Sequence, residues 1–172
     1  VAYAHALGLE VDGLPFLQHV DKQALNSLRR QVATGKDFPL TSCMASLVDA
    51  VAGLIGIRNE TTYESQAAME MMALARPFVP SMKCYPFVLE ATENGTVIRL
   101  KDLLTAILKD VRNHCPIEMI AARFHKTIAE MAVDVCRRAR RSTGLNEVAL
   151  SGNIWQNSIL TGQVRNGLKR DG

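Results

Sequence analysis

The sequence predicts a helix-rich α/β fold, and three observations carry that prediction. Apolar residues recur at helical spacing through most of the chain, which indicates several amphipathic helices. Two strand-like runs, 85–92 and 96–100, flank Asn94-Gly95, a strong signal for a β-hairpin near 85–100. The segment 147–169 has the pattern of a strand, a turn and a helix. We therefore expect a helical part over residues 1–80 and an α/β part over residues 81–172.

Composition limits the classes of protein to consider. Of the 172 residues, 48% are hydrophobic and 22% are charged, values typical of a folded globular protein. The net charge of +3 hides a split, because residues 1–98 carry 7 Lys and Arg against 10 Asp and Glu, whereas residues 99–172 carry 13 against 7. The surplus of positive charge in residues 99–172 is spread over several helices and differs from the basic stripe of nucleic-acid-binding proteins. No nucleic-acid partner is therefore predicted. No apolar run approaches the ~20 residues of a membrane span, so no membrane association is predicted.

The cysteines and histidines show no arrangement typical of a metal or redox site. The four cysteines have no CxxC or similar spacing, and the four histidines have no metal-ligand spacing, so no metal site is predicted within the chain. No signal peptide is recognisable, which favours a reduced, cytoplasmic location. Neither a GxxxxGK[ST] nor a GxGxxG motif is present, and no residue occupies a recognisable nucleophile elbow or dyad, so no catalytic residue is predicted.

The chain opens with helical patterns. Residues 1–8 have one such pattern, and Asp21 is an N-cap candidate for a second helix that Gly35 would close. Pro39 is expected to break the helical pattern before the next helix begins. Because residue 1 lies directly in a helical pattern without a cap, we expect the chain to be cut from a longer polypeptide.

The next helix contains a residue that its apolar stripe does not explain. It is predicted to begin at Thr41 or Ser42 and to end at Gly56. Asp49 lies within its apolar and small residues, with no Lys or Arg three or four positions away. Two interpretations stay open: a solvent-facing Asp, or a carboxylate that accepts hydrogen bonds from the hydroxyls of a ligand.

Three further helices are predicted from their ends. The segment 61–64, Thr-Thr-Tyr-Glu, has the form of a capping box for a helix over 64–75. A helix over 101–111 follows the hairpin. Pro116 then opens the longest helix, which runs to about Arg141 and is closed by Gly144. The buried face predicted for this helix consists of Ile117, Ile120, Ala121, Phe124, Ile128, Met131 and Val135. Its basic run, 137–141, is interpreted as a solvated end that offsets the helix dipole.

The last unit is the most informative part of the chain. A buried strand is predicted over 148–150, a turn at Ser151-Gly152-Asn153, and a helical pattern from Ile154 onward. A small, Gly-containing turn before a helix leaves backbone N–H groups free at a positive helix N-terminus, which suits a phosphate or nucleotide. Most units of this kind bind nothing, so the pattern alone does not establish a site.

Four segments together resemble the C-terminal part of the HypF carbamoyltransferase family, in that family's order. They are 41–58 (Thr-Ser-Cys-Met-Ala-Ser-Leu-Val-Asp-Ala-Val-Ala-Gly-Leu-Ile-Gly-Ile-Arg), 63–68 (Tyr-Glu-Ser-Gln-Ala-Ala), 121–125 (Ala-Ala-Arg-Phe-His) and 148–157 (Val-Ala-Leu-Ser-Gly-Asn-Ile-Trp-Gln-Asn). The resemblance covers nearly the whole chain. It implies a partial actin-like ATPase (ASKHA) domain, of the branch shared with threonylcarbamoyl transferases, and a fragment of one carbamoyl-transfer domain truncated at both ends.

The resemblance also implies an activity, with substrates and a partner. The complete protein is expected to use carbamoyl phosphate and ATP to form carbamoyl-adenylate. This domain would bind the adenylate and pass the carbamoyl group to a C-terminal cysteine of HypE, for synthesis of the cyanide ligand of NiFe hydrogenase. The fragment alone is expected to be inactive. The family's His-rich metal motif would lie upstream of residue 1, so any metal ligands are expected outside this chain.

Residue by residue, the resemblance implies a nucleotide site. Asp49 matches an Asp expected near the ribose hydroxyls, Ser151 and Gly152 match a turn that approaches the nucleotide through its backbone, and Asn157 matches an Asn, in the first turn of the following helix, that contacts the nucleotide. Asn153 stands where the family has a second Gly, and it is included in the predicted site because Asn tolerates positive φ.

The chain departs from the family pattern elsewhere. Ala45 and Ser46 replace Gly-Arg, and Ser65 replaces a Gly. Two other functions stay open: a threonylcarbamoyl-type tRNA modification protein with the same fold, and a non-enzymatic helical interaction module. The segment 63–66, the Gln156-Asn157 pair and the lack of a basic stripe favour the carbamoyltransferase.

Overall fold

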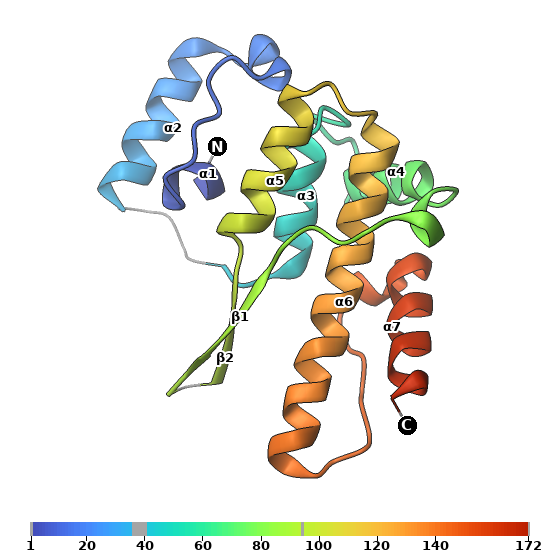
Figure 1. Ribbon diagram of the computed structural model, residues 1–172. Helices are drawn as coiled ribbons and strands as arrows, with labels where there is room; N and C mark the ends of the chain where they lie inside the picture. The colour runs from blue at the N-terminus through green and yellow to red at the C-terminus, as the bar shows by residue number, and fades with distance from the viewer. Residues whose placement is uncertain (1, 36–40, 94, 172) are drawn as a thin grey trace.

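The computed structural model describes residues 2–35, 41–93 and 95–171, and within them it shows many helices and one two-stranded sheet (Figure 1). The elements follow in the order α1 (Ala2–Ala6), η1 (Pro15–His19), α2 (Lys22–Thr34), α3 (Met44–Leu54), α4 (Gln66–Ala75), η2 (Val79–Ser81), β1 (Val88–Thr92), β2 (Gly95–Arg99), α5 (Lys101–Arg112), α6 (Ile117–Thr143), η3 (Asn153–Gln156) and α7 (Ser158–Arg170). The predicted helix-rich α/β class is therefore confirmed.

Several predicted helix ends are confirmed by their capping geometry. The side chain of Asp21 accepts a hydrogen bond from the N–H of Ala24 (2.8 Å), and Gly35 ends α2 with a left-handed backbone (φ +63°). Pro116 precedes the first residue of α6, and Gly144 ends that helix with φ +74°. The predicted stop at Pro39 and the hairpin residue Asn94 lie outside the described residues.

The capping box predicted for α4 is wrong. The helix begins at Gln66, because Ser65 before it adopts a left-handed conformation (φ +63°) and leaves Glu64 outside the helix. The side chain of Gln66 folds back instead, and its Oε1 accepts hydrogen bonds from the N–H (2.8 Å) and the hydroxyl (3.1 Å) of Thr62. The helix end is thus closed by Gln66, two positions beyond the predicted Glu64.

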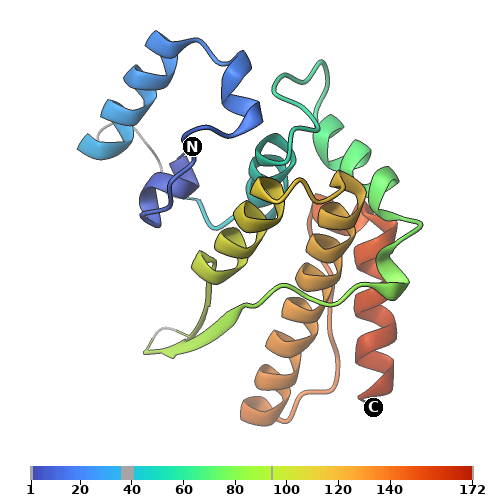
Figure 2. The same ribbon diagram turned by 45° about the horizontal axis from the view of Figure 1, so that its top comes forward.

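Helix α6 organises the core. It packs against α4 and α7, and all three helices lie side by side in both views (Figures 1 and 2). Most of its predicted buried face is confirmed: Ile120, Ala121, Phe124, Ile128 and Met131 are buried. Two positions are wrong, since Ile117 is 38% exposed and Val135 is only half-buried. Val133 is buried instead, because α7 covers that side of α6.

The hairpin is confirmed near its predicted place. Strands β1 and β2 pair antiparallel, with Leu89 opposite Ile98. Leu89 is buried while Val88 and Val97 are exposed, which is the alternation expected when one face of a pair covers a core.

The buried strand predicted over 148–150 is wrong. Residues 145–150 belong to no helix or strand and run back along α6 (Figure 1), with Leu145 69% and Val148 47% exposed. A strand needs a neighbouring strand for its backbone N–H and C=O groups, and the sheet that the described residues contain consists of β1 and β2. The single helix predicted from Ile154 is also wrong, since η3 and α7 are separate elements that meet at Asn157.

Candidate functional site

A cavity of about 190 Å³ lies between α3, α4 and η3, and it collects three of the five predicted site residues. Asp49 comes from α3, whereas Asn153 and Asn157 come from the two ends of η3, more than a hundred residues later. Ser65 and Gln156 add polar groups, and the apolar part of the lining is formed by Ala45, Val48, Ala68, Met69, Met72 and Ile154. A polar rim over an apolar floor is the usual form of a small-molecule site.

Asp49 lies at the exposed edge of α3 because its neighbours take the buried face. Leu47 and Val48 are buried, so the next position along the helix turns outward. Within the described residues no hydrogen bond or ion pair engages its carboxylate, and partial burial raises the pKa of Asp49 above its usual value. The carboxylate oxygens therefore remain available as acceptors for the hydroxyls of a ligand.

Asn157 occupies a different position from the one predicted. It is the N-cap of α7 rather than a residue of its first turn, and its Oδ1 accepts hydrogen bonds from the N–H groups of Ile159 (3.1 Å) and Leu160 (3.2 Å). Its Nδ2 lies 3.0 Å from Nε2 of His125 on α6. Asn157 therefore joins the cavity to two helices of the core.

His125 does not line the cavity but contacts Asn157, which does, and the sequence did not predict this contact. Its side chain is buried, with 1% of the residue exposed, and Nδ1 lies 2.8 Å from the carbonyl oxygen of Ala121. Burial lowers the pKa of this imidazole. The signal in the sequence was its spacing, because His125 lies four positions after Ala121 and four before Ala129, both of which are buried.

The remaining predicted residues form the turn before η3. Gly152 has φ +99° and ψ 161°, a conformation open almost only to glycine, so the positive φ of the turn belongs to Gly152 and not to Asn153. Ser151 and Gly152 are exposed and do not line the cavity. The structure thus brings together Asp49, Asn153 and Asn157, and it leaves Ser151 and Gly152 beside them.

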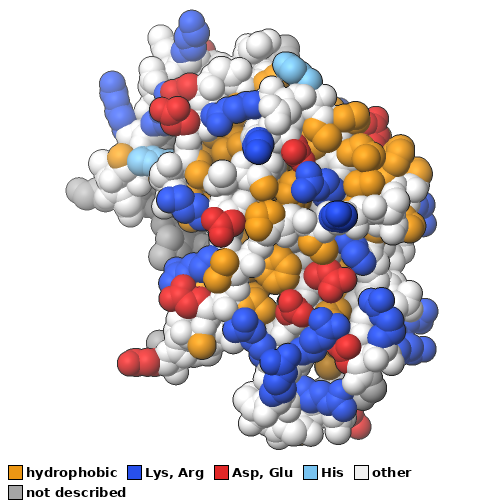
Figure 3. All heavy atoms as spheres, viewed as in Figure 1, with side chains coloured by type: hydrophobic (Ala, Val, Ile, Leu, Met, Phe, Trp, Pro, Cys, Tyr) orange, Lys and Arg blue, Asp and Glu red, His pale blue; other side chains and the backbone are white. Residues whose placement is uncertain are grey.

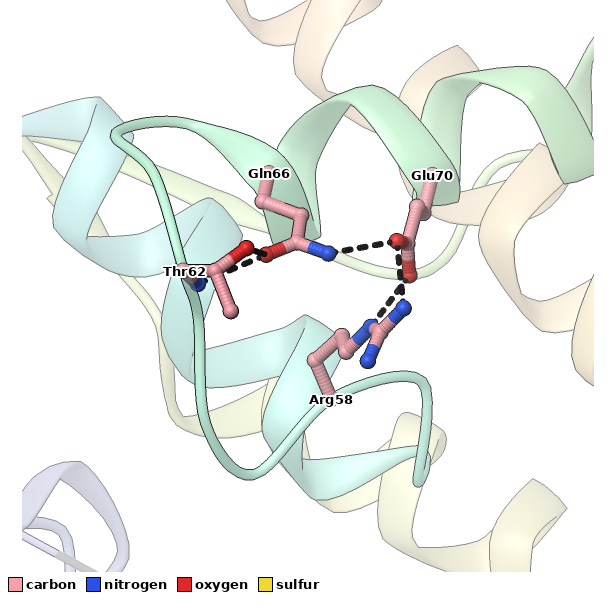
Figure 4. A network of polar contacts seen from close by, with 4 residues as sticks. All are labelled: Arg58, Thr62, Gln66 and Glu70. Atoms are coloured by element: carbon pink, nitrogen blue, oxygen red, sulfur yellow. Dashed lines mark hydrogen bonds and ion pairs between the residues drawn. The ribbon is translucent and has the colours of Figure 1, made fainter.

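The loop between α3 and α4 is held by a polar network next to the cavity (Figure 4). Arg58 donates to both carboxylate oxygens of Glu70 (2.8 and 3.0 Å), and the Nε2 of Gln66 donates to the same carboxylate (3.0 Å). Gln66 in turn binds Thr62, as described above. The network fixes both ends of the segment that places Ser65 in the cavity wall.

The cysteines differ in their environments. Cys43 is exposed at the N-cap of α3, where the backbone N–H groups of Ser46 and Ala45 lower the pKa of its thiol. Burial raises the thiol pKa of the other three, Cys84, Cys115 and Cys136. In the part of the chain that the structure describes, no three His, Cys, Asp or Glu side chains gather closely enough to hold a metal ion.

Basic side chains gather at the far end of α6, on the lower part of the face in Figure 3. Arg137 forms ion pairs with Asp134 and with Asp171 beyond the end of α7, and Arg140 donates to the backbone oxygen of Asp171 (2.6 Å). Arg138 and Arg141 are exposed, as expected for a solvated helix end. None of the helices among the described residues combines the length and apolar character that crossing a bilayer requires.

Comparison with known proteins identifies the family. Residues 1–172 match the family model described as "Carbamoyltransferase, Kae1-like Domain, second subdomain". The chain belongs to the HypF carbamoyltransferase family. It is 31% identical, over 147 residues, to the carbamoyltransferase HypF of Synechocystis sp., which covers 86% of this chain and 18% of that protein. It is 23% identical, over 151 residues, to the probable carbamoyltransferase HypF of Methanocaldococcus jannaschii, which covers 88% of this chain and 19% of that protein.

A solved structure of HypF has a similar fold. The crystal structure of full-length HypF in the phosphate- and nucleotide-bound form matches with a TM-score of 0.84 and 32% sequence identity, over 91% of this chain and 20% of that one. The chain spans about a fifth of the length of these three HypF proteins.

Proposed function

We propose that this chain forms the part of a HypF carbamoyltransferase, of actin-like ATPase fold, that binds the nucleotide of carbamoyl-adenylate in the cavity between α3, α4 and η3. The observation that carries the proposal is the convergence of Asp49, Asn153 and Asn157, from segments far apart in the sequence, on one cavity. The family match and the nucleotide-bound form of the similar HypF structure support it.

The cavity offers groups that suit a nucleotide. The free carboxylate of Asp49 can accept hydrogen bonds from ribose hydroxyls, and the apolar floor of Val48, Met69 and Met72 can pack against a planar base. Side-chain amides at Asn153 and Asn157 add polar groups on the opposite wall. The turn at Gly152 precedes η3, and it would contact the nucleotide through its backbone because Gly152 has no side chain.

In the proposed reaction, the bound adenylate is an activated carbamoyl donor. A thiolate at the C-terminal cysteine of HypE attacks the carbamoyl carbon, so that a C–S bond forms while the bond from that carbon to the phosphate oxygen breaks and AMP leaves. The role of this chain is to hold the nucleotide so that the carbamoyl carbon is presented in a fixed position. The thiocarboxamide formed on HypE would then be dehydrated toward the cyanide ligand of NiFe hydrogenase. ATP and carbamoyl phosphate are the substrates of the complete protein, and HypE is its partner.

Substitution of Asp49 tests the site in the complete protein. Asp49→Ala removes the acceptors for the hydroxyls of the ligand, and we expect it to weaken carbamoyl-adenylate binding by about 1–3 kcal/mol in calorimetry. Asp102→Ala is the matched control, because Asp102 is an exposed Asp on α5 that does not line the cavity. Equal carbamoyl-adenylate affinities of Asp49→Ala and the wild type would contradict the proposed site.

A further inference from the structure

The amide of Asn157 can adopt only one orientation. On one side it faces the N–H groups of Ile159 and Leu160, two donors that require the oxygen Oδ1. The reversed orientation would place the NH₂ group against these donors, where no hydrogen bond forms. The orientation of Asn157 is therefore set by the first turn of α7.

His125 enforces the same orientation from the other side. Its Nδ1 faces the carbonyl oxygen of Ala121, which only accepts, so Nδ1 carries the proton of the ring. Burial of His125 favours the neutral ring, which leaves Nε2 as an acceptor. The group opposite Nε2 must then be a donor, and it is the Nδ2 of Asn157 at 3.0 Å.

These contacts leave one hydrogen-bonding group of the Asn157 side chain unused. Both acceptor positions of Oδ1 are filled by α7, and one of the two N–H bonds of Nδ2 is directed to His125. Among the described residues, the second N–H has no hydrogen-bond partner, and Asn157 lines the cavity. A ligand that binds this side chain from the cavity therefore meets a donor and never an acceptor.

Asn157 contacts the nucleotide in the proposed function, and we infer that His125 is a positioning residue that directs the free N–H of Asn157 toward an acceptor atom of the nucleotide. The inference rests on the proposed function, since it names the part played by each group of the same cavity. The two walls are then complementary: Asp49 on α3 accepts from hydroxyls, and Asn157 donates to a phosphate oxygen or to a ring nitrogen. The first wall selects the sugar and the second selects an acceptor.

Asn157→Asp in the complete protein tests the donor. Asp keeps an oxygen for the cap of α7, and its second oxygen faces Nε2 of His125, which must then carry a proton, but Asp has no N–H to offer the nucleotide. Since the new charge also lies near the phosphates, Asn153→Asp is the matched control, because it places the same charge in the same cavity. We expect Asn157→Asp to lower carbamoyl-adenylate affinity by about tenfold more than Asn153→Asp does. Equal losses in the two variants would overturn the inference.

His125→Phe tests the positioning role through a double-mutant cycle. Because His125 acts only through Asn157, we expect His125→Phe to reduce carbamoyl-adenylate affinity in the wild type and to add nothing in the Asn157→Asp background. Its effect should persist in the Asn153→Asp background. A purely structural role of His125 would give the same loss in all three backgrounds, which would overturn the assignment. Should His125→Phe fail to fold, selective ¹⁵N labelling of the wild type still decides the point, since a proton on Nε2 in place of Nδ1 contradicts it.

Two comparisons separate this inference from the proposed function and identify the acceptor. If Asp49→Ala weakens carbamoyl-adenylate binding but Asn157→Asp matches its control, the site stands and the inference fails. If neither Asp49→Ala nor Asn157→Asp changes the affinity, both fail. Adenosine distinguishes the acceptors: a ring nitrogen predicts the same loss for adenosine as for carbamoyl-adenylate in Asn157→Asp, and a phosphate oxygen predicts a loss for carbamoyl-adenylate only.

Discussion

Ser65 carries a backbone strain that its neighbours hold in place. It adopts φ +63° without a side-chain capping bond, in the left-handed region where a residue with a Cβ is disfavoured by about 1–2 kcal/mol. The adjoining network of Arg58, Gln66 and Glu70 fixes the loop from both sides and so over-determines this conformation. Strain of this kind gathers at ligand sites, and Ser65 lies in the wall of the cavity.

Ser65→Gly is expected to stabilise the protein. Glycine adopts the left-handed conformation without strain, and part of that gain is offset by the greater entropy of glycine in the unfolded chain. We expect a net increase in the free energy of unfolding of up to about 1 kcal/mol, measured by urea titration. Ser65→Ala is the control, since it keeps the Cβ and should give no such increase. A gain of the same size in Ser65→Ala would show that the strain is not the cause.

His125 makes stability depend on pH in a defined window. Burial lowers the pKa of His125 in the folded protein below the value of about 6.5 expected in the unfolded chain. As the pH falls through 6.5, the unfolded chain binds a proton at this position that the folded protein does not bind, so the free energy of unfolding decreases. We expect His125→Phe, which cannot titrate, to lose this part of the slope between pH 7 and pH 5. Above pH 7.5 the slopes of the two proteins should coincide, which serves as the internal control.

At the scale of the elements, sequence signals were reliable where a helix end or a turn is specified locally. Asp21, Gly35, Pro116 and Gly144 have the caps that their residue types predict, because each acts through its own backbone or the next turn. The prediction of a strand at 148–150 was wrong because strand pairing depends on a partner strand that the local sequence does not specify. The predicted start of α4 was wrong for a similar reason, since the conformation of Ser65 is held by Arg58 and Glu70 rather than by Ser65 itself.

The packing of α7 on α6 depends on Gly167. A Cβ at this position would lie 2.6 Å from Cγ2 of Val133, which is buried in the contact. We expect Gly167→Ala to lower the free energy of unfolding by about 1–3 kcal/mol, as overpacking does. Val133→Ala in the same chain should recover part of that loss, because it removes the clashing methyl groups, and the two effects should not add.

Gly162 supplies the control on the same helix. An added Cβ there would meet nothing within 4 Å, so Gly162→Ala should gain roughly 0.5–1 kcal/mol from helix propensity alone. Destabilisation by Gly162→Ala of the same size as by Gly167→Ala would mean that the helix, and not the contact with Val133, is sensitive to the substitution. Thermal or urea unfolding distinguishes these outcomes.

At the scale of the whole molecule, the sequence predicted three residues that line the cavity, but it did not predict the contacts that hold them there. Asp49, Asn153 and Asn157 do meet at one cavity, and the resemblance to the family was the reason for choosing them. The contact of Asn157 with His125 spans 32 positions in the chain and joins two separate elements, so no local pattern could reveal it. The use of Asn157 as the cap of α7 was likewise hidden by the intervening turn of η3.

Tyr85 connects three parts of the molecule that are distant in sequence. Its hydroxyl donates to Asp110 on α5 (2.7 Å), its backbone N–H donates to Thr127 on α6 (2.8 Å), and the guanidinium of Arg123 lies 4.0 Å from the centre of its ring. Tyr85 is almost completely buried (1% exposed), and burial together with the bond to Asp110 raises the pKa of its phenol. The hydroxyl is therefore neutral at pH 7 and acts as a donor to Asp110.

Tyr85→Phe should weaken this connection without creating a cavity. The ring, its contact with Arg123 and the backbone bond to Thr127 all remain, and Asp110 keeps its ion pair with Arg123. Only the hydroxyl is lost, so we expect the free energy of unfolding to fall by about 1–2 kcal/mol in urea titrations. Tyr63→Phe, at a side chain that is 52% exposed, is the matched control and should change the stability by less than about 0.5 kcal/mol. Equal effects of the two substitutions would show that the bond to Asp110 adds nothing to the joining of α5, α6 and the segment before β1.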